Sequence, residues 1–354
     1  MKITNKKSMH SKPKNNIDQD VLRQDALINE CKGNLFEYLV GLRLSQLAHI
    51  EQDFHQNLDS RLKKQLKEYE SMLRKIGPDI LGKLMEFSKQ TTQQIFPRIK
   101  ENIVGVSIVG KMENLRIKEE FKEADLLVAT HSGIIPISLK LSKSGAFVNT
   151  KSAGAKSFIE KYFSYFQDAG FYQKELNQLI ERNYYHMGQT LYQMIGLDFK
   201  GEFDESWLEE GYSELPGQLP LEMKKIVQKN YQQTISHIYA ILEKMSHERE
   251  PFARSLLNLI GLGHPDMLQV ICFNKKINNG ESYELESIYI GDCAEKMQEV
   301  GHFEMMPFNP QISSLEIRFP GFQLQIRIKP MNKFTTPSYK INCSVHYGVK
   351  HAKS

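Results

Sequence analysis

The sequence predicts an α+β fold, and three observations support this prediction. Apolar residues recur every three or four positions from about residue 20 to residue 98, and again between about residues 155 and 260, as in amphipathic helices. Short runs rich in β-branched residues and leucine between 102 and 151 indicate a small sheet. The last ninety residues alternate with the period of a strand. Helices and strands that are grouped along the chain favour an α+β core with a β-rich C-terminal region.

The N-terminal half is predicted to change from helix to strand near residue 100. A helix is expected to start at Pro78, since proline is favoured at the first helical position. Four short runs then read as strands. They cover residues 102–110, 124–130, 134–141 and 146–151.

The rest of the chain is predicted as three helical stretches followed by five strands. The helical stretches are expected at residues 155–167, 174–196 and about 220–260. The strands are expected at residues 266–274, 282–291, 313–320, 322–330 and 339–348.

The length and charge of the chain limit the number of domains it can form. A chain of 354 residues, 40% hydrophobic and 25% charged, is long enough for two domains or one domain with a large attachment. The first seventeen residues hold five lysines and no acid, so residues 1–20 are expected to be a disordered basic tail, either simply solvated or weakly attracted to polyanions. We expect a mainly helical region over 21–262 and a β-rich region over 263–354.

Several function classes are not indicated. No run approaches the roughly 18 apolar residues that span a bilayer, and no apolar stretch follows the basic start as in a secretory signal. We therefore expect no membrane partner and a cytoplasmic location. Cys31, Cys272, Cys293 and Cys343 lie far apart without a CxxC pair, which indicates buried thiols rather than a zinc site or disulfide framework.

The residues that carry chemistry lie on two consecutive predicted strands. Asp125 and Lys140 sit near the ends of these strands, which are joined by the tight turn His-Ser-Gly, so a hairpin would bring a carboxylate and an ammonium into one pocket. A carboxylate can hold Mg²⁺, which polarises a phosphoryl oxygen and acidifies a water, and an ammonium can stabilise the charge of the transition state. The spacing alone equally allows Lys140 to mark the solvated end of a strand.

The wider pattern resembles the PD-(D/E)XK nucleases. Asp125 is followed by Ser138-x-Lys140 and preceded by Glu37 in the predicted helix GNLFEYLVGLRL. The resemblance implies a core with a central mixed sheet flanked by helices, assembled around Mg²⁺. Ser138 stands where the family has Asp or Glu, which removes one expected acidic ligand. A hydroxyl, a backbone carbonyl or a water can complete the octahedral shell.

Two blocks resemble HaeIII-type type II restriction endonucleases more closely. One is the motif ISLK at residues 137–140, and the other is the closing segment GFQLQIRIKPMNKFTTPSYKINCSVHYG. The resemblance is clear over about a quarter of the chain, in two separated blocks that contain these segments and stand in the order and spacing that the family shows. The resemblance implies cleavage of duplex DNA, with a catalytic region over 21–262 and DNA contacts from the β-rich region over 263–354.

The resemblance also implies roles for individual residues. Asp125 would be the principal Mg²⁺ ligand, and Glu37 would reach the metal through water. Lys140 would orient or activate the attacking water. Ser138 would be an auxiliary ligand or a water anchor. For Glu37, a surface position on the helix is the alternative.

Glu123 is a candidate metal ligand in place of the missing acid. It lies two residues before Asp125 and should face the same side of the strand. The favoured alternative for Glu123 is an edge residue paired with Lys118 or Lys122.

A second candidate site lies in NTKSAGAKSFIEKYF. Ser152 is expected to cap a helix that carries Lys156 in its first turn, with Lys151 just outside, which outlines a phosphate site. An ordinary helix cap with solvated lysines is the equal alternative. Arg318, Arg327 and Lys329, on or beside the terminal strands, are further candidates for contacts with bases or phosphates, or are simply solvent-facing.

These features predict a Mg²⁺-dependent type II restriction endonuclease that acts on double-stranded DNA. The resemblance suggests GGCC as the site, and a cognate DNA methyltransferase would protect the host. Cutting both strands of a palindrome is most simply done by a homodimer. Two alternatives stay open: a nucleic-acid-binding protein without catalysis, in which Asp125 and Lys140 only pair, and a nuclease of the same core that acts on RNA or branched DNA.

Overall fold

The computed structural model describes residues 15–109, 121, 123–277, 282–330 and 333–348, and its chain divides into two compact units. Unit 1 consists of Met1–Ile117, Asp125–Gly133 and Asn274–Glu286. Unit 2 consists of Lys118–Ala124, Ile134–Phe273 and Ser287–Ser354. Most of the basic tail expected over residues 1–20 lies outside the described residues, and helix α1 already begins at Asn15.

Unit 1 is built mainly from four helices. They are α1 (Asn15–Leu47), α2 (Glu51–Asn57), α3 (Ser60–Ile76) and α4 (Pro78–Ile95), and a short 3₁₀ turn follows at Phe96–Arg98. Helices α1, α3 and α4 pack against one another. The sequence marks the starts of α3 and α4, since Asp59 accepts hydrogen bonds from the N–H groups of Arg61 (2.7 Å) and Leu62 (3.3 Å), and Pro78 opens α4 as expected.

Strands β1 (Ile103–Ile108) and β2 (Leu126–Thr130) pair antiparallel in unit 1. The five-stranded sheet to which they belong has the order β1-β2-β3-β5-β6. Its other members are β3 (Ile134–Lys143), β5 (Leu268–Ile277) and β6 (Ser282–Asp292), and β5 and β6 each contribute residues to both units.

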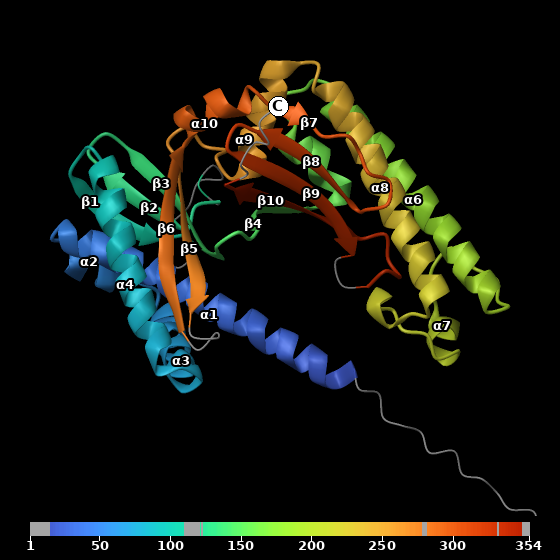
Figure 1. Cartoon of the computed structure of the whole chain (residues 1–354), viewed down its shortest axis with the longest axis horizontal. Coiled ribbons are helices and arrows are strands. Elements are labelled where there is room, and N and C mark those ends of the chain that lie inside the picture. Colours follow the sequence, from blue (N-terminus) through green and yellow to red (C-terminus); the bar gives the residue numbers. More distant parts are fainter. Residues whose placement is uncertain (1–14, 110–120, 122, 278–281, 331–332, 349–354) are drawn as a thin grey trace, which may run out of the picture. The chain divides into compact units, whose positions relative to one another are not determined.

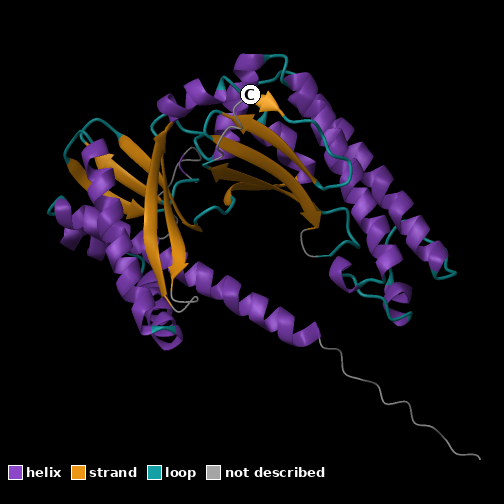
Figure 2. Ribbon diagram, in the orientation of Figure 1, coloured by secondary structure: helices purple, strands orange, loops and turns teal. Residues whose placement is uncertain are grey.

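Unit 2 contains a second five-stranded sheet with the order β4-β10-β9-β8-β7. All four of its strand pairs are antiparallel. The strands are β4 (Val148–Gly154), β7 (Glu304–Met305), β8 (Ser314–Phe319), β9 (Phe322–Pro330) and β10 (Tyr339–Tyr347). Burial alternates along β8, β9 and β10, so one face of the sheet is apolar and the other polar. Figure 2 shows this sheet with helices beside it.

Helices α8 (Leu221–Met245) and α9 (Arg249–Ile260) contact this sheet. Helix α6 (Ala169–Met194) runs beside α8 and packs on it (Figure 1). The shorter elements of unit 2 are α5 (Phe158–Tyr162), α7 (Glu205–Glu209), α10 (Cys293–Val300) and the 3₁₀ turns Ala155–Ser157 and Pro216–Gln218. A cluster of aromatic rings joins α6 to α7. It comprises Tyr192, Phe199, Phe203, Trp207 and Phe334.

The α+β class, the strands around residues 102–151 and the β-rich C-terminal region are confirmed. The helix expected over residues 155–167 is confirmed over residues 155–162, as a 3₁₀ turn followed by α5, and is wrong over residues 163–167. Strand β4 continues to Gly154, and the buried Gln173 then fixes a turn by accepting from the Ile159 N–H (2.8 Å) and donating to the Ala155 carbonyl (3.0 Å).

The boundary expected near residue 262 does not separate the compact units, because β10 pairs with both β9 and β4 inside unit 2. The C-terminal strands are thereby built into the same unit as residues 134–273. No helix in the described part of the chain is long and apolar enough to cross a membrane.

Candidate active site

The turn between β2 and β3 is closed by several hydrogen bonds. The Thr130 N–H donates to the Gly133 carbonyl at 2.8 Å, and the Gly133 N–H donates to the Thr130 hydroxyl at 3.3 Å. The Glu101 carboxylate accepts from the Ser132 N–H (3.1 Å) and hydroxyl (2.5 Å). The hydrogen bonds from Ser132 lower the pKa of Glu101. This carboxylate therefore fastens the turn as an anion, a role that the sequence did not indicate.

Asp125 lies directly before β2 and is half-buried. Its backbone carbonyl accepts a hydrogen bond from the Val109 N–H at 3.1 Å, just past the end of β1. The pairing of β1 with β2 thus fixes the backbone at Asp125. The burial of Leu126, Leu127 and Val128 anchors the strand that follows it.

Ser138 and Lys140 lie on β3, where alternation directs both side chains to the same face. Ser138 is 4% exposed and Lys140 is half-buried, while Ile137 and Leu139 are buried at the alternate positions. The expectation that the strand ends near Lys140 is wrong, because β3 continues to the exposed Lys143. Lys140 is therefore an interior position of the strand.

Glu37 lies on α1 and is half-buried, next to the fully buried Phe36. None of the residues Glu37, Asp125, Ser138 and Lys140 is without an interaction partner.

The predicted Mg²⁺ ligands are carboxylates, which suit this hard cation. Magnesium keeps several waters and is usually held by one or two protein carboxylates, so the pair Asp125 and Glu37 has the right donor chemistry. Among the residues that the structure describes, no group of three or more His, Cys, Asp or Glu side chains is arranged to hold a metal. A site here would therefore depend on water and a substrate phosphate for its remaining ligands.

Glu123 does not lie on a strand with Asp125. It sits in a turn before β2, where strand alternation does not apply, and its carboxylate forms an ion pair with Lys151. Lys151 is only 7% exposed, and burial, with a contribution from the charge of Lys161, lowers its pKa to about 8. This ion pair belongs to unit 2 and occupies the carboxylate that was expected to replace the missing acid.

The phosphate site predicted around Ser152 takes a different form. Ser152 is not a helix cap but a residue of β4, and its hydroxyl donates to Asn342 Oδ1 on β10 at 2.9 Å. Lys156 lies in the 3₁₀ turn that follows β4 and forms an ion pair with Glu181. The free helix N–H groups on which that prediction depended are therefore not next to Ser152.

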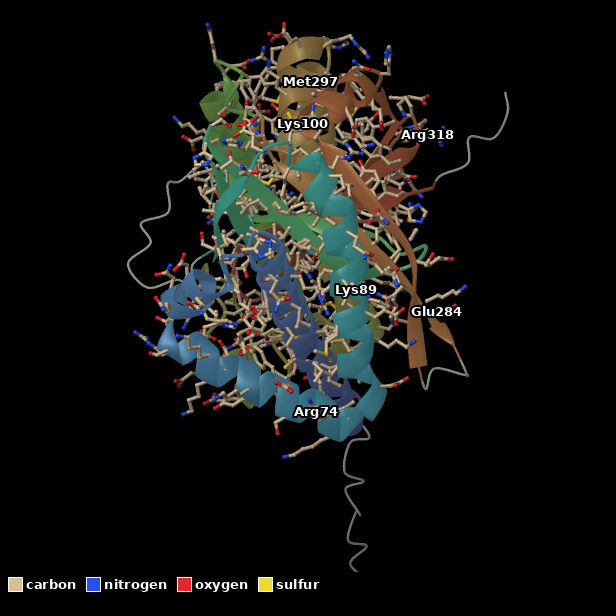
Figure 3. The ribbon with its side chains drawn as sticks, turned by 90° about the vertical axis from the view of Figure 1, so that its left-hand side faces the viewer. Arg74, Lys89, Lys100, Glu284, Met297 and Arg318 are labelled. Carbon is tan, nitrogen blue, oxygen red and sulfur yellow. The ribbon has the colours of Figure 1, made fainter. Side chains whose placement is uncertain are left out.

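Arg318, Arg327 and Lys329 all lie on the polar face of the second sheet. Arg318, which Figure 3 labels, lies on β8 at 3.8 Å from Glu304 of β7. Arg327 and Lys329 lie on β9 and are exposed.

No family model, curated protein or solved structure matches the chain. The resemblance to HaeIII-type restriction endonucleases thus remains a prediction from the sequence.

Proposed function

We propose that the protein is a Mg²⁺-dependent endonuclease that hydrolyses phosphodiester bonds in duplex DNA at a short specific site, as a type II restriction enzyme. The observation that carries the proposal is the order of groups along β2 and β3. An acid, Asp125, precedes β2, a tight turn follows, and Ser138 and Lys140 share one face of β3. These are the groups that metal-assisted phosphodiester hydrolysis requires.

Each of these residues has a chemical task in the proposal. The Asp125 carboxylate supplies a negative oxygen ligand for a hard cation, and the Glu37 carboxylate acts through water. Bound Mg²⁺ would polarise a phosphoryl oxygen and lower the pKa of a water. The Lys140 ammonium stabilises the negative charge that develops on the phosphate, and it orients the attacking water. The Ser138 hydroxyl anchors a water.

The local structure supports this assignment by holding the functional groups on rigid backbone. The Val109–Asp125 hydrogen bond fixes one end of β2, and the Thr130–Gly133 and Ser132–Glu101 hydrogen bonds fix the other. Catalytic groups need to be held close to their working geometry, and strands do so better than loops. A strand also delivers Ser138 and Lys140 to one side without further support.

The α+β architecture and the resemblance of residues 137–140 and of the closing segment to HaeIII-type enzymes extend the proposal. On this basis we propose GGCC as the recognition sequence and a cognate methyltransferase as the functional partner. We also propose that two copies of the chain act together, because a twofold axis matches the symmetry of a palindrome.

The test is cleavage of unmethylated phage DNA by the purified chain. We expect discrete fragments with Mg²⁺ and none with a chelator, and sequencing the fragment ends gives the site. Linear single-stranded RNA and a four-way DNA junction are the comparison substrates. If either of these is cleaved faster than duplex DNA, the substrate is RNA or branched DNA instead.

A nucleic-acid-binding protein without catalysis is the second candidate. It is favoured by one observation, that the described residues hold no cluster of three potential metal ligands. This candidate would be established if the chain binds duplex DNA but leaves it uncut after long incubation with Mg²⁺ at high protein concentration.

A further inference from the structure

The polar face of the second sheet in unit 2 carries three neighbouring cations. Arg327 and Lys329 lie two residues apart on β9, and the register places Lys340 of β10 directly opposite Lys329. Arg327 and Lys329 are exposed and Lys340 is half-buried. Partial burial, followed by the charges of Arg327 and Lys340, lowers the pKa of Lys329. The three side chains are thus close enough to repel one another. We call them the β9–β10 cation group.

Like charges directly opposite each other destabilise a sheet. Within the described part of the chain, no acidic side chain forms an ion pair with Arg327, Lys329 or Lys340. The contrast with Arg318 on the same face is informative, since Arg318 has Glu304 as an ion-pair partner at 3.8 Å. The unfavourable arrangement of the β9–β10 cation group is explained if an anionic partner covers it.

The spacing suits a polyphosphate backbone. Residues two apart on a strand are about 7 Å apart, which is the axial rise of two nucleotides in one DNA strand. Adjacent strands lie about 4.8 Å apart, so Lys340 extends the group sideways. The same face presents Asn342 opposite Arg327, and Gln325 two residues before it, as neutral hydrogen-bonding groups.

The side chains on this face favour a duplex over a single strand. Sheets that bind single strands present aromatic rings on which bases stack. The positions of β8, β9 and β10 that face away from the core carry no Phe, Tyr or Trp. They are Ser314, Glu316, Arg318, Gln323, Gln325, Arg327, Lys329, Lys340, Asn342, Ser344 and His346. The wide major groove of B-DNA also admits paired β-strands, whereas the deep, narrow major groove of an RNA helix does not.

We propose that the β9–β10 cation group, Arg327, Lys329 and Lys340, binds the phosphates of duplex DNA. The inference rests on the proposed function for the identity of the polyanion. It removes Arg318 from the predicted interface, because Glu304 already neutralises it, and adds Lys340. The helices α8 and α9 contact this sheet, and its apolar face is buried, so within unit 2 the polar face is the one left for a partner.

The test measures binding of a fluorescein-labelled 20-base-pair DNA duplex without Mg²⁺ over a range of salt concentrations. The variant carries Arg327→Ala, Lys329→Ala and Lys340→Ala. Each lost phosphate contact reduces the steepness of log K against log salt by about 0.9, so we expect a reduction of about 2.7 and at least a tenfold loss of affinity at low salt. Intrinsic fluorescence of the single tryptophan, Trp207, checks that the variant is folded.

The matched control removes the same net charge from the helices. Lys174 on α6 and Lys229 and Lys244 on α8 are exposed, and Lys174→Ala, Lys229→Ala and Lys244→Ala should leave the salt slope unchanged. An equal drop in the salt slope of this control would overturn the proposal, because the loss of binding would then follow from the lower net charge and not from the position of the three residues. No change in the β9–β10 variant, or no binding of duplex by the unaltered chain, would overturn it as well.

Two further outcomes separate this inference from the proposed function. If a duplex RNA of the same sequence binds more tightly through the same three residues, the assignment to DNA is wrong. The second outcome is that the β9–β10 variant shows the expected reduction in the slope of log K against log salt while the unaltered chain does not cleave DNA with Mg²⁺. In that case the assignment of the binding surface is supported and the nuclease proposal is wrong.

Discussion

At the residue scale, Lys140 and Lys151 lie on two strands that follow one another along the chain, and the two side chains differ in burial. Lys151 of β4 is buried and already paired with Glu123, which suits a structural charge. Lys140 of β3 is half-buried, shares a strand face with Ser138, and is interior to its strand. In the proposed reaction, the Lys140 ammonium acts on the scissile phosphate.

Lys140→Ala should lower the rate of DNA cleavage by at least about 100-fold, the loss typical when a stabiliser of the transition state is removed. Lys140→Arg should not restore the rate, because a guanidinium is wider, directs its N–H groups differently and stays charged. The measurement is single-turnover cleavage of plasmid DNA with saturating Mg²⁺.

Lys143→Ala is the matched control for Lys140, since Lys143 is an exposed lysine on the same strand. It should cleave at the unaltered rate. Ser138→Ala should lose less activity than Lys140→Ala, because water can take the place of the hydroxyl. Full cleavage by Lys140→Arg, together with unfolding of Lys140→Ala, would show that Lys140 is a structural charge.

The stability of the protein should rise with pH above about 8 because of Lys151. Its pKa is about 8 in the folded state and, from the ordinary value for lysine, about 10.4 in the unfolded chain. Between these values the unfolded chain binds more protons, so the free energy of unfolding increases with pH, at up to about 1.4 kcal/mol per unit.

The measurement is urea unfolding at pH 7.5 and pH 9.5 for the unaltered chain and for Lys151→Met. The pH-dependent gain should be smaller in Lys151→Met, which removes the ionisable group and keeps most of the side-chain volume. An equal gain in both proteins would mean that the ion pair with Glu123 keeps Lys151 fully charged throughout this range.

At the element scale, the helix α6 depends on close packing at one glycine. A Cβ atom on Gly188 would run into the ring of Phe199, a member of the aromatic cluster beside Trp207. Trp207 is fully buried, and its indole N–H donates to the Ser213 carbonyl at 3.2 Å. The approach of Phe199 to the α6 backbone therefore helps to fix the segment that joins α6 to α7.

Gly188→Ala should lower the free energy of unfolding by about 1–3 kcal/mol, as overpacking of a tight core does. Gly170→Ala on the same helix meets nothing within 4 Å and should be neutral or slightly stabilising. Urea unfolding followed by Trp207 fluorescence measures both. Equal stability of the two variants would show that Phe199 moves aside without cost.

The sequence predicts the elements well because their signals are local. The start of α4 at Pro78 and the alternation of β9 and β10 can be read from neighbouring residues. The surroundings of Ser152 and Lys151 cannot, because they depend on β10, about 190 residues later. The pattern Ser-Ala-Gly-Ala-Lys fits a helix cap, and only the pairing with β10 makes it part of a strand.

At the scale of the whole molecule, the two kinds of proposed function lie on different parts of the chain. The chemical groups belong to the first sheet and its helix α1, and the β9–β10 cation group belongs to the second sheet. The sequence predicts both the acid and the lysine of the first set, and their catalytic roles stay a prediction. The sequence alone did not point to Lys340. Its position directly opposite Lys329 depends on strand register, which composition and periodicity do not fix.

This division predicts that catalysis and binding can be separated by substitution. Removing a metal ligand should stop the reaction while leaving the phosphate-binding surface intact. Removing the β9–β10 cation group should weaken binding while the cleavage rate of bound DNA changes little.

Asp125→Ala, measured for DNA binding and Mg²⁺-dependent cleavage in the same preparation, tests the central claim most directly. We expect duplex binding equal to or tighter than that of the unaltered chain, because a negative charge is removed, and cleavage below detection. Asp53→Ala is the control, since Asp53 is an exposed acid on α2, and it should bind and cleave normally. Cleavage by Asp125→Ala near the unaltered rate would contradict the assignment of Asp125 to a metal site and, with it, the proposed nuclease.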